Sequence, residues 1–185
     1  LYATDASAYR EIPSAVAIPR DKSDLTQIIK FARDHKTSLI PRTAGTSLAG
    51  QVVGPGIVVD VSKHMNKILE FNEKERWVSV EPGVIRDDLN VYLKKYGLFF
   101  SPETSTANRA MIGGMVGNNS CGSNSVVYKS TREHLISLKM ILADGEEVEF
   151  KELSLTEFKD KVSGLTCTSK LEQNIYSTIN DILSD

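Results

Sequence analysis

Cysteine and histidine are scarce in this sequence of 185 residues, which has two cysteines and three histidines. Cys121 and Cys167 lie far apart and form no CxxC spacing, so we expect free thiols rather than a disulfide framework. The histidines show no HExxH-like pairing, which argues against a metal centre. The sequence therefore predicts no metal site.

Long apolar runs and a strong charge of one sign are also missing. No run approaches the roughly 18 residues of a membrane-spanning helix, and the first residues lack the pattern of a signal segment. The formal net charge of -2 disfavours binding to nucleic acid or to anionic membranes. We expect a soluble, cytoplasmic chain without nucleic-acid partners, long enough for one globular domain that can be built as two small lobes.

The common nucleotide-binding and nucleophile fingerprints are absent: there is no GxGxxG opening a helix, no GxxxxGK[ST] and no GxSxG. Two clusters of small residues stand out instead, PRTAGTSLAG at 41–50 and AMIGGMVGNNSCGS at 110–123. Glycine lets backbone N–H groups approach a ligand, and hydroxyls add donors. Either cluster alone is typical of a surface loop. Together they predict two walls of one site for a phosphorylated cofactor.

The apolar pattern predicts strands and helices around these clusters. Strands are expected at 15–18, 39–40 and 57–61, with a helix from an N-cap at Ser23 to about His35. This order places the first cluster at the carboxyl end of a strand, where α/β proteins commonly bind ligands.

Further along, we expect paired strands at 68–71 and 77–80, a helix over 85–96, and hairpin strands at 135–142 and 147–150 around Asp144-Gly145. The pattern is helical from Leu155 onward. These elements predict a first lobe over 1–61, a second over 62–153 and a C-terminal helical extension over 154–185. The abrupt end of the last helix predicts a fragment that leads to a missing substrate domain.

Short motifs follow one another in a fixed order: PRTAGTSLAG at 41–50, EPG at 81–83, SPE at 101–103, IGGMVGNN at 112–119, Gly122, Tyr128, TREH at 131–134 and LADG at 142–145. From Ala15 to about Phe150, this order resembles the FAD-binding domain of the FAD-linked oxidases. That family includes vanillyl-alcohol oxidase, glycolate oxidase, and the D-lactate and D-2-hydroxyglutarate dehydrogenases.

The resemblance implies an α+β, two-lobed FAD-binding fold of the PCMH type, with FAD in the cleft between the lobes. It implies oxidation of a small 2-hydroxy acid, such as D-lactate, glycolate or D-2-hydroxyglutarate, by hydride transfer to FAD. Substrate-binding and catalytic groups would come from a following domain, so we assign no catalytic residue. An electron acceptor or an iron–sulfur module elsewhere is a further implied partner. The cofactor-binding positions carried over from the family are Pro41, Arg42, Thr43, Ala44, Gly45, Thr46, Ser47, Leu48, Pro102, Glu103, Thr104, Ser105, Gly113, Gly114, Gly117, Asn118, Asn119 and Gly122.

Two positions depart from the family pattern. Members that hold FAD covalently place a histidine where this sequence has Thr46, so we expect FAD to be bound noncovalently. Relatives usually have glycine after the tyrosine equivalent to Tyr128, whereas this chain has Lys129, which reaches positive φ less easily. Two alternatives stay open: a non-catalytic nucleotide-binding or regulatory module on the same fold, and an FAD reductase acting on a different substrate.

Overall fold

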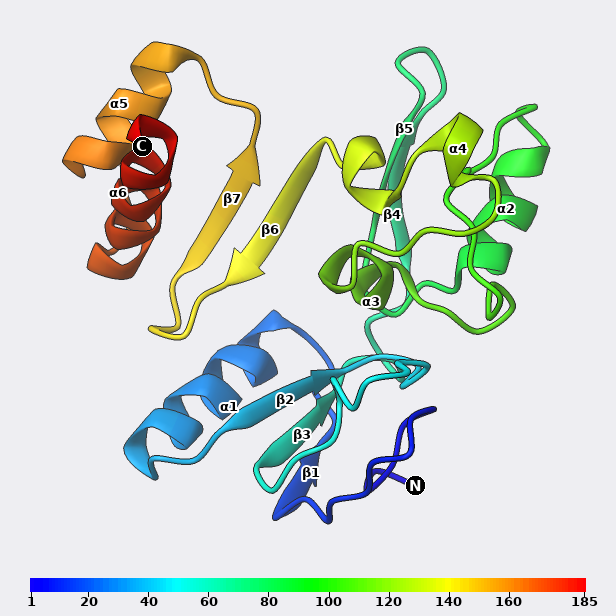
Figure 1. The fold of residues 1–185 in the computed structure, drawn as a ribbon, viewed down its shortest axis with the longest axis horizontal. Helices are drawn as coiled ribbons and strands as arrows, with labels where there is room; N and C mark the ends of the chain where they lie inside the picture. Colours follow the sequence, from blue (N-terminus) through cyan, green and yellow to red (C-terminus); the bar gives the residue numbers. More distant parts are fainter.

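The structure is a computed structural model that describes all residues from Leu1 to Asp185. Its first lobe is a three-stranded parallel sheet with a helix against it, drawn in blue and cyan in Figure 1. The strands are β1 (Ala15–Ala17), β2 (Leu39–Arg42) and β3 (Ile57–Asp60), in the order β1-β3-β2. All four residues of the central strand β3 are buried, which explains its continuous apolar run.

Helix α1 (Lys22–Asp34) covers the sheet because Leu25 and Ile28 pack against Ile57 and Val59. The predicted N-cap at Ser23 is wrong, since Ser23 lies inside the first turn. Asp21 caps the helix instead, because its extended backbone lets its carboxylate accept the N–H of Asp24 at 3.0 Å.

The second lobe has its own core of Val84, Leu89 and Leu93. Its antiparallel pair β4 (Ile68–Asn72) and β5 (Trp77–Val80) packs against α2 (Arg86–Lys94). Three short helices follow. They are α3 (Ile112–Gly117), α4 (Ser125–Tyr128) and the 3-10 helix η1 (Thr131–His134). The centre of the second small-residue cluster is thus a helix rather than a loop.

The β6–β7 hairpin leads from the second lobe back to the first. Strands β6 (Ser137–Ile141) and β7 (Glu147–Lys151) meet in antiparallel register around the predicted Asp144-Gly145 turn. Arg33 of α1 donates to the carbonyl of Asp144 at 2.6 Å, and Lys22 pairs with Glu147. These contacts hold the turn of the hairpin against α1, which lies just below the turn in Figure 1.

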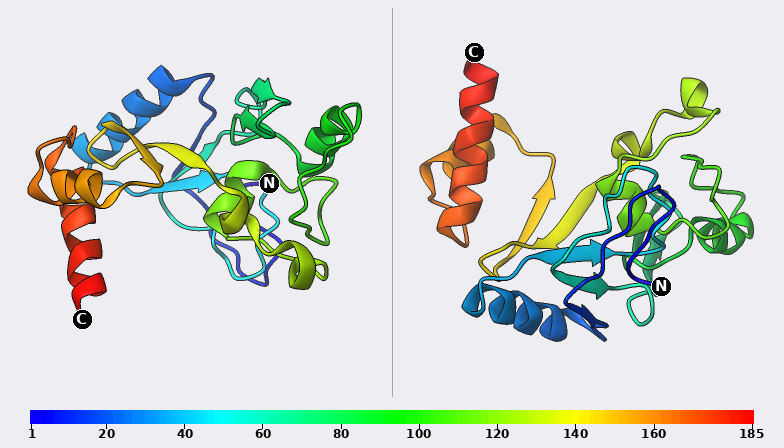
Figure 2. Two further views of the ribbon diagram at one scale, coloured as in Figure 1. Left: turned by 90° about the horizontal axis from the view of Figure 1, so that it is seen from above. Right: turned by 60° about the horizontal axis from the view of Figure 1, so that its bottom comes forward.

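Two further helices, α5 (Leu155–Ser163) and α6 (Lys170–Ser184), form a helical hairpin beside β7. Figure 2 shows that α6 extends away from the rest of the molecule. The Tyr176 ring anchors it, with its centroid 5.9 Å from that of Phe150 on β7. None of the helices has both the length and the apolar character needed to cross a membrane.

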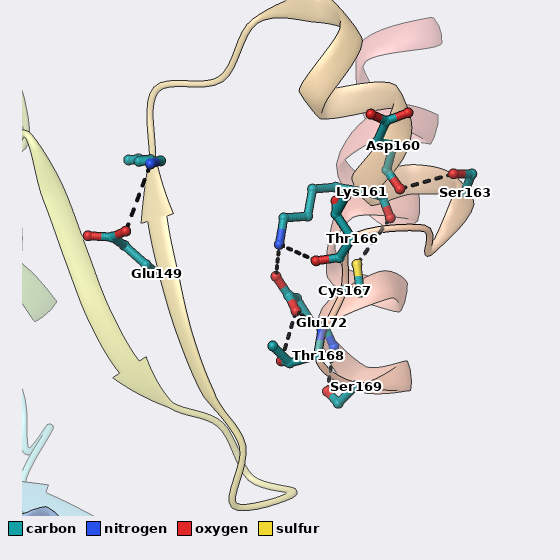
Figure 3. A network of polar contacts seen from close by, with 10 residues as sticks. Glu149, Asp160, Lys161, Ser163, Thr166, Cys167, Thr168, Ser169 and Glu172 are labelled. Atoms are coloured by element: carbon teal, nitrogen blue, oxygen red, sulfur yellow. Dashed lines mark hydrogen bonds and ion pairs between the residues drawn. The ribbon is translucent and has the colours of Figure 1, made fainter.

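A buried ion pair joins α5 to α6 (Figure 3). Lys161 donates to Glu172 at 2.7 Å and to the carbonyl of Thr166 at 2.9 Å. The second carboxylate oxygen of Glu172 accepts from the backbone and hydroxyl of Thr168 at 2.6 and 2.9 Å. Burial raises the pKa of Glu172, but the hydrogen bonds from Lys161 and Thr168 outweigh it and hold the pKa below its usual value. Glu172 is therefore ionised and fully paired although its side chain is 1% exposed.

Candidate cofactor site

A cleft of about 2210 Å³ opens between the two lobes. It is well above the roughly 300–1,000 Å³ of ordinary small-molecule pockets, so it has room for a large ligand. Both small-residue clusters contribute to its walls. The predicted residues that line it are Pro41, Arg42, Thr43, Gly45, Thr46, Ser47, Leu48, Thr104, Ser105, Gly113, Gly114, Gly117, Asn118 and Asn119.

The first wall is the loop of residues 43–48, which we call the first loop. It follows β2 directly, and Gly45 turns it with a φ of +67°. None of the backbone N–H groups of residues 43–48 donates to another protein atom, although residues 43–47 are partly buried. Buried backbone donors are almost always paired in native proteins. This run of free donors is therefore suited to an anionic ligand.

The second wall is formed by α3 and the segment before it. A side chain at Gly114 would place its Cβ 2.5 Å from the Thr43 hydroxyl, so this glycine lets the two walls approach. Gly117 also lines the cleft, but nothing lies within 4 Å of its Cβ position. The surface at Gly117 is therefore open to a flat ligand group.

One side-chain hydrogen bond connects the walls directly. Gln51, just after the first loop, donates to Asn118 at 3.1 Å, and Asn118 in turn donates to Ser120 at 3.3 Å. Gln51 was not among the residues predicted from the sequence. Its only signal is its place beside Gly50 at the end of the first cluster.

Four predicted residues do not line the cleft: Ala44, Pro102, Glu103 and Gly122. Pro102 is fully buried. Gly122 packs against Glu103, where an added Cβ would stand 2.5 Å from the backbone carbonyl. This pair therefore supports the second wall from behind.

Arg109 is a cleft-lining cation that the sequence analysis missed. Its guanidinium makes one side-chain hydrogen bond, to Asn108 at 3.2 Å, and no ion pair. Thr106 lines the cleft beside it. One feature of the sequence could have indicated Arg109. It lies between the hydroxyl-rich residues 101–106 and the second small-residue cluster, and the chain has no P-loop lysine to bind a phosphate.

A polar cluster behind the second wall holds Asn119 in place. The Asn119 side-chain carbonyl accepts from the Arg132 N–H at 2.9 Å, and the Ser130 hydroxyl oxygen lies 2.9 Å from it. Glu133 accepts from the hydroxyl and N–H of Ser130 at 2.6 and 3.0 Å. These two bonds lower the pKa of the Glu133 carboxyl to about 2, and the bond from the hydroxyl has the larger effect.

Acid should weaken this cluster. The pKa of Glu133 is lowered in the folded state, so its contribution to stability is complete above the unfolded value of about 4.3 and is lost as the pH falls toward 2. We expect wild type to have a higher Tm than Glu133→Gln at pH 6, with the difference shrinking between about pH 4.5 and 2. Thermal unfolding of both proteins across this pH range measures the difference in Tm. A pH-independent difference would contradict the assignment.

Lys129 has a strained backbone conformation that favours glycine. Its backbone has φ +65° and ψ -166°, a region used almost only by glycine. The carbonyl of Tyr128 is held by the His134 ring, whose Nε2 donates to it at 2.6 Å. The surrounding contacts therefore impose the conformation on Lys129.

Lys129→Gly should stabilise the protein by about 1 kcal/mol, because relief of strain exceeds the added flexibility of the unfolded chain. Chemical denaturation would measure the gain. Lys129→Ala is the matched control, since it removes the ammonium group and keeps the strained φ. Equal stability of the two variants would show that the backbone at this position is not strained.

Comparison with known families identifies the fold. The profile of a family described as an FAD binding domain matches residues 13–151, most of the chain. The chain belongs to this family. It is an FAD-binding domain with the predicted two-lobed α+β fold, and both the resemblance and the cofactor expected from the sequence are confirmed.

This FAD-binding domain resembles parts of much longer proteins. It is 46% identical over 146 residues to D-2-hydroxyglutarate dehydrogenase of Pantoea ananatis and 40% identical over 176 residues to that of Escherichia coli. It is 35% identical over 148 residues to glycolate oxidase subunit GlcD of Bacillus subtilis. These matches cover 77%, 94% and 79% of the chain. The chain spans 14% and 17% of the length of the two dehydrogenases and 32% of the glycolate oxidase subunit.

Solved structures agree on the fold. Alkyldihydroxyacetonephosphate synthase superposes with a TM-score of 0.67 at 18% sequence identity. The match covers 77% of this chain and 28% of that one. Such low identity supports a shared fold only.

The cleft of the FAD-binding domain fits the chemistry of FAD. The free N–H groups of residues 43–48 and the hydroxyls of Thr43, Thr46 and Ser47 suit a diphosphate, since charge-assisted hydrogen bonds from several donors are strong. The open space at Gly117 allows a flat ring to lie against the backbone. Free donors thus line the first wall, and an open glycine surface lies on the second.

Proposed function

We propose that this domain is the flavin-binding part of a dehydrogenase that oxidises a small 2-hydroxy acid, with D-2-hydroxyglutarate, D-lactate and glycolate as candidate substrates. The observation that carries the proposal is the run of unpaired backbone donors at residues 43–48, facing α3 across the cleft. The sequence identity to D-2-hydroxyglutarate dehydrogenases supports a 2-hydroxy acid as the substrate. Bound flavin supplies the redox chemistry by accepting hydride.

In this proposal, the chain's own residues bind and orient the cofactor. The backbone N–H groups of the first loop donate to the diphosphate. On the opposite wall, Gly114 lets the two walls lie close together, and Gly117 leaves open space for the cofactor. The proposed cofactor residues are those predicted from the sequence, with Ala44, Pro102, Glu103 and Gly122 supporting the walls. Thr46 offers a hydroxyl and no imidazole, so FAD is held noncovalently and should stay in solution after acid precipitation of the protein.

We also propose how the protein is organised. Residues 1–61 and 62–153 are the two lobes, and 154–185 is a helical extension toward a domain that supplies substrate-binding and catalytic groups. An electron acceptor or an iron–sulfur module belongs to the same larger assembly. The free thiols Cys121 and Cys167 support a cytoplasmic location.

Anaerobic reduction of bound FAD tests the activity. D-2-hydroxyglutarate, D-lactate or glycolate is added to the complete polypeptide that includes this chain, and the flavin absorption is followed, with the L-enantiomers of the chiral acids as controls. We expect one of these acids to bleach the flavin. Bleaching by dithionite but by no 2-hydroxy acid would contradict the proposal and favour a flavin enzyme of another substrate class.

A further inference from the structure

The N-terminal residues 2–9, which we call the strap, lie across the first lobe beside the first loop. The strap folds back on itself through a bridge between Thr4 and Arg10. It reaches the end of the parallel sheet, where the Tyr2 hydroxyl donates to Asp60 at 2.7 Å. Figure 2 shows this dark blue segment next to the cyan loop that follows β2. The strap thus contacts the sheet edge from which the first loop emerges.

Two buried charges at this edge depend on the strap. Arg42 and Asp60 are paired in register on β2 and β3, and they are only 8% and 5% exposed. The one side-chain hydrogen bond of Arg42 goes to the carbonyl of Thr4 at 2.8 Å, and its guanidinium lies 5.6 Å from the centre of the Tyr2 ring. Asp60 accepts from Ser62 as well as from Tyr2. Without the strap, Arg42 would lose its polar partner and its ring contact.

Arg42 passes this constraint to the first loop. A Cβ at Gly45 would stand 2.6 Å from Cζ of Arg42, so the guanidinium fills the floor of the loop at its glycine. At the other end, a Cβ at Gly50 would stand 2.8 Å from the Tyr9 ring. The strap therefore supports the first loop through Arg42 and contacts the chain just after the loop through Tyr9.

We infer that the strap is a positioning element for the cofactor site: Tyr2 and Thr4 fix Arg42, and Arg42 fixes the first loop in the conformation that binds FAD. The inference rests on the proposed role of residues 43–48 in holding FAD. Docking of the strap and binding of FAD are then coupled, and each favours the other by the same factor. In this inference Tyr2 is a positioning residue that acts through Arg42, which itself lines the cleft.

Substitution of Tyr2 tests the coupling. Tyr2→Ala removes both the ring and the hydroxyl, and we expect the FAD dissociation constant to rise about tenfold, within the usual range of coupling between sites. Tyr2→Phe keeps the ring under the guanidinium and should restore most of the affinity. Fluorescence titration well below Tm measures both variants. Wild-type affinity in Tyr2→Ala would overturn the inference.

Tyr96→Ala is the matched control. The Tyr96 ring also contacts a cation, since Nζ of Lys95 lies 4.9 Å from its centre, but Tyr96 does not line the cleft. This variant should lower Tm without changing FAD affinity. The reverse coupling has its own readout: FAD should slow tryptic cleavage after Arg10, which requires the strap to open. An unchanged cleavage rate would also overturn the inference. If substitution at Gly45 abolishes FAD binding while Tyr2→Ala does not, the proposed site stands and only the coupling fails.

Discussion

Gly45→Asp will abolish FAD binding while the fold stays largely intact. The new Cβ would stand 2.6 Å from Cζ of Arg42, at a φ of +67° that side chains rarely adopt. The first loop or the guanidinium must therefore move. The new side chain points at the guanidinium that fills the floor of the first loop, so it displaces Arg42 and the loop from the conformation proposed to bind the diphosphate. We expect the FAD dissociation constant to rise at least about 100-fold, measured by fluorescence titration.

Gly97→Asp is the matched control for this variant. Gly97 has a φ of +68°, lies in an exposed turn after α2, and has nothing within 4 Å of its Cβ position. It therefore introduces the same residue and the same backbone strain outside the cleft. We expect a loss of stability in both proteins, larger in Gly45→Asp because of the contact with Arg42, and a loss of FAD affinity in Gly45→Asp alone. Normal FAD binding by Gly45→Asp would show that the first loop is only a connection between strands.

Glu172→Ala will destabilise the α5–α6 hairpin by about 3 kcal/mol, because removing one partner of a buried ion pair leaves the other charge uncompensated. The Lys161 side chain is 19% exposed and would keep only the Thr166 carbonyl as a partner. Chemical denaturation measures the loss. Since the pKa of Glu172 is lowered in the folded state, the difference from wild type should be complete at neutral pH and shrink below about pH 4.3.

Glu157→Ala serves as the control on the same helical hairpin. Glu157 is an exposed member of the capping box at the start of α5, so its removal should cost about 1 kcal/mol or less. Neither variant should change FAD affinity, because neither side chain lines the cleft. A loss in Glu172→Ala no larger than in Glu157→Ala would show that the buried pair contributes little net stability.

Local sequence patterns predicted the elements that depend on local chemistry. The apolar run 57–61 is the buried central strand β3, and Asp144-Gly145 forms the hairpin turn with Gly145 at φ +90°. Helix α3 escaped prediction because three of its six residues are glycine, a poor helix former. Tertiary contacts override that preference: Gly113 packs closely on Pro82, and its N–H donates to the Pro82 carbonyl at 2.9 Å.

The candidate site was also predictable in part, because some of its features depend on local chemistry. Small residues and hydroxyls indicated both walls, because close backbone approach needs glycine wherever it occurs. The supporting contacts carry no such local signal. Tyr2 meets Asp60 across 58 positions of sequence, and the hydrogen bond from Arg42 to the Thr4 carbonyl spans 38. Such long-range partners emerge only when the sheet is assembled.

The strand order β1-β3-β2 has a consequence for how the first lobe forms during synthesis. The central strand is the last of the three in the sequence, and β1 and β2 pair only with it. Until Ile57–Asp60 has left the ribosome, the two earlier strands have no partner in the sheet, and parallel pairing between distant segments is intrinsically slow. The first loop therefore takes shape only after residue 60 has left the ribosome, so a nascent chain stalled before that point should bind no flavin.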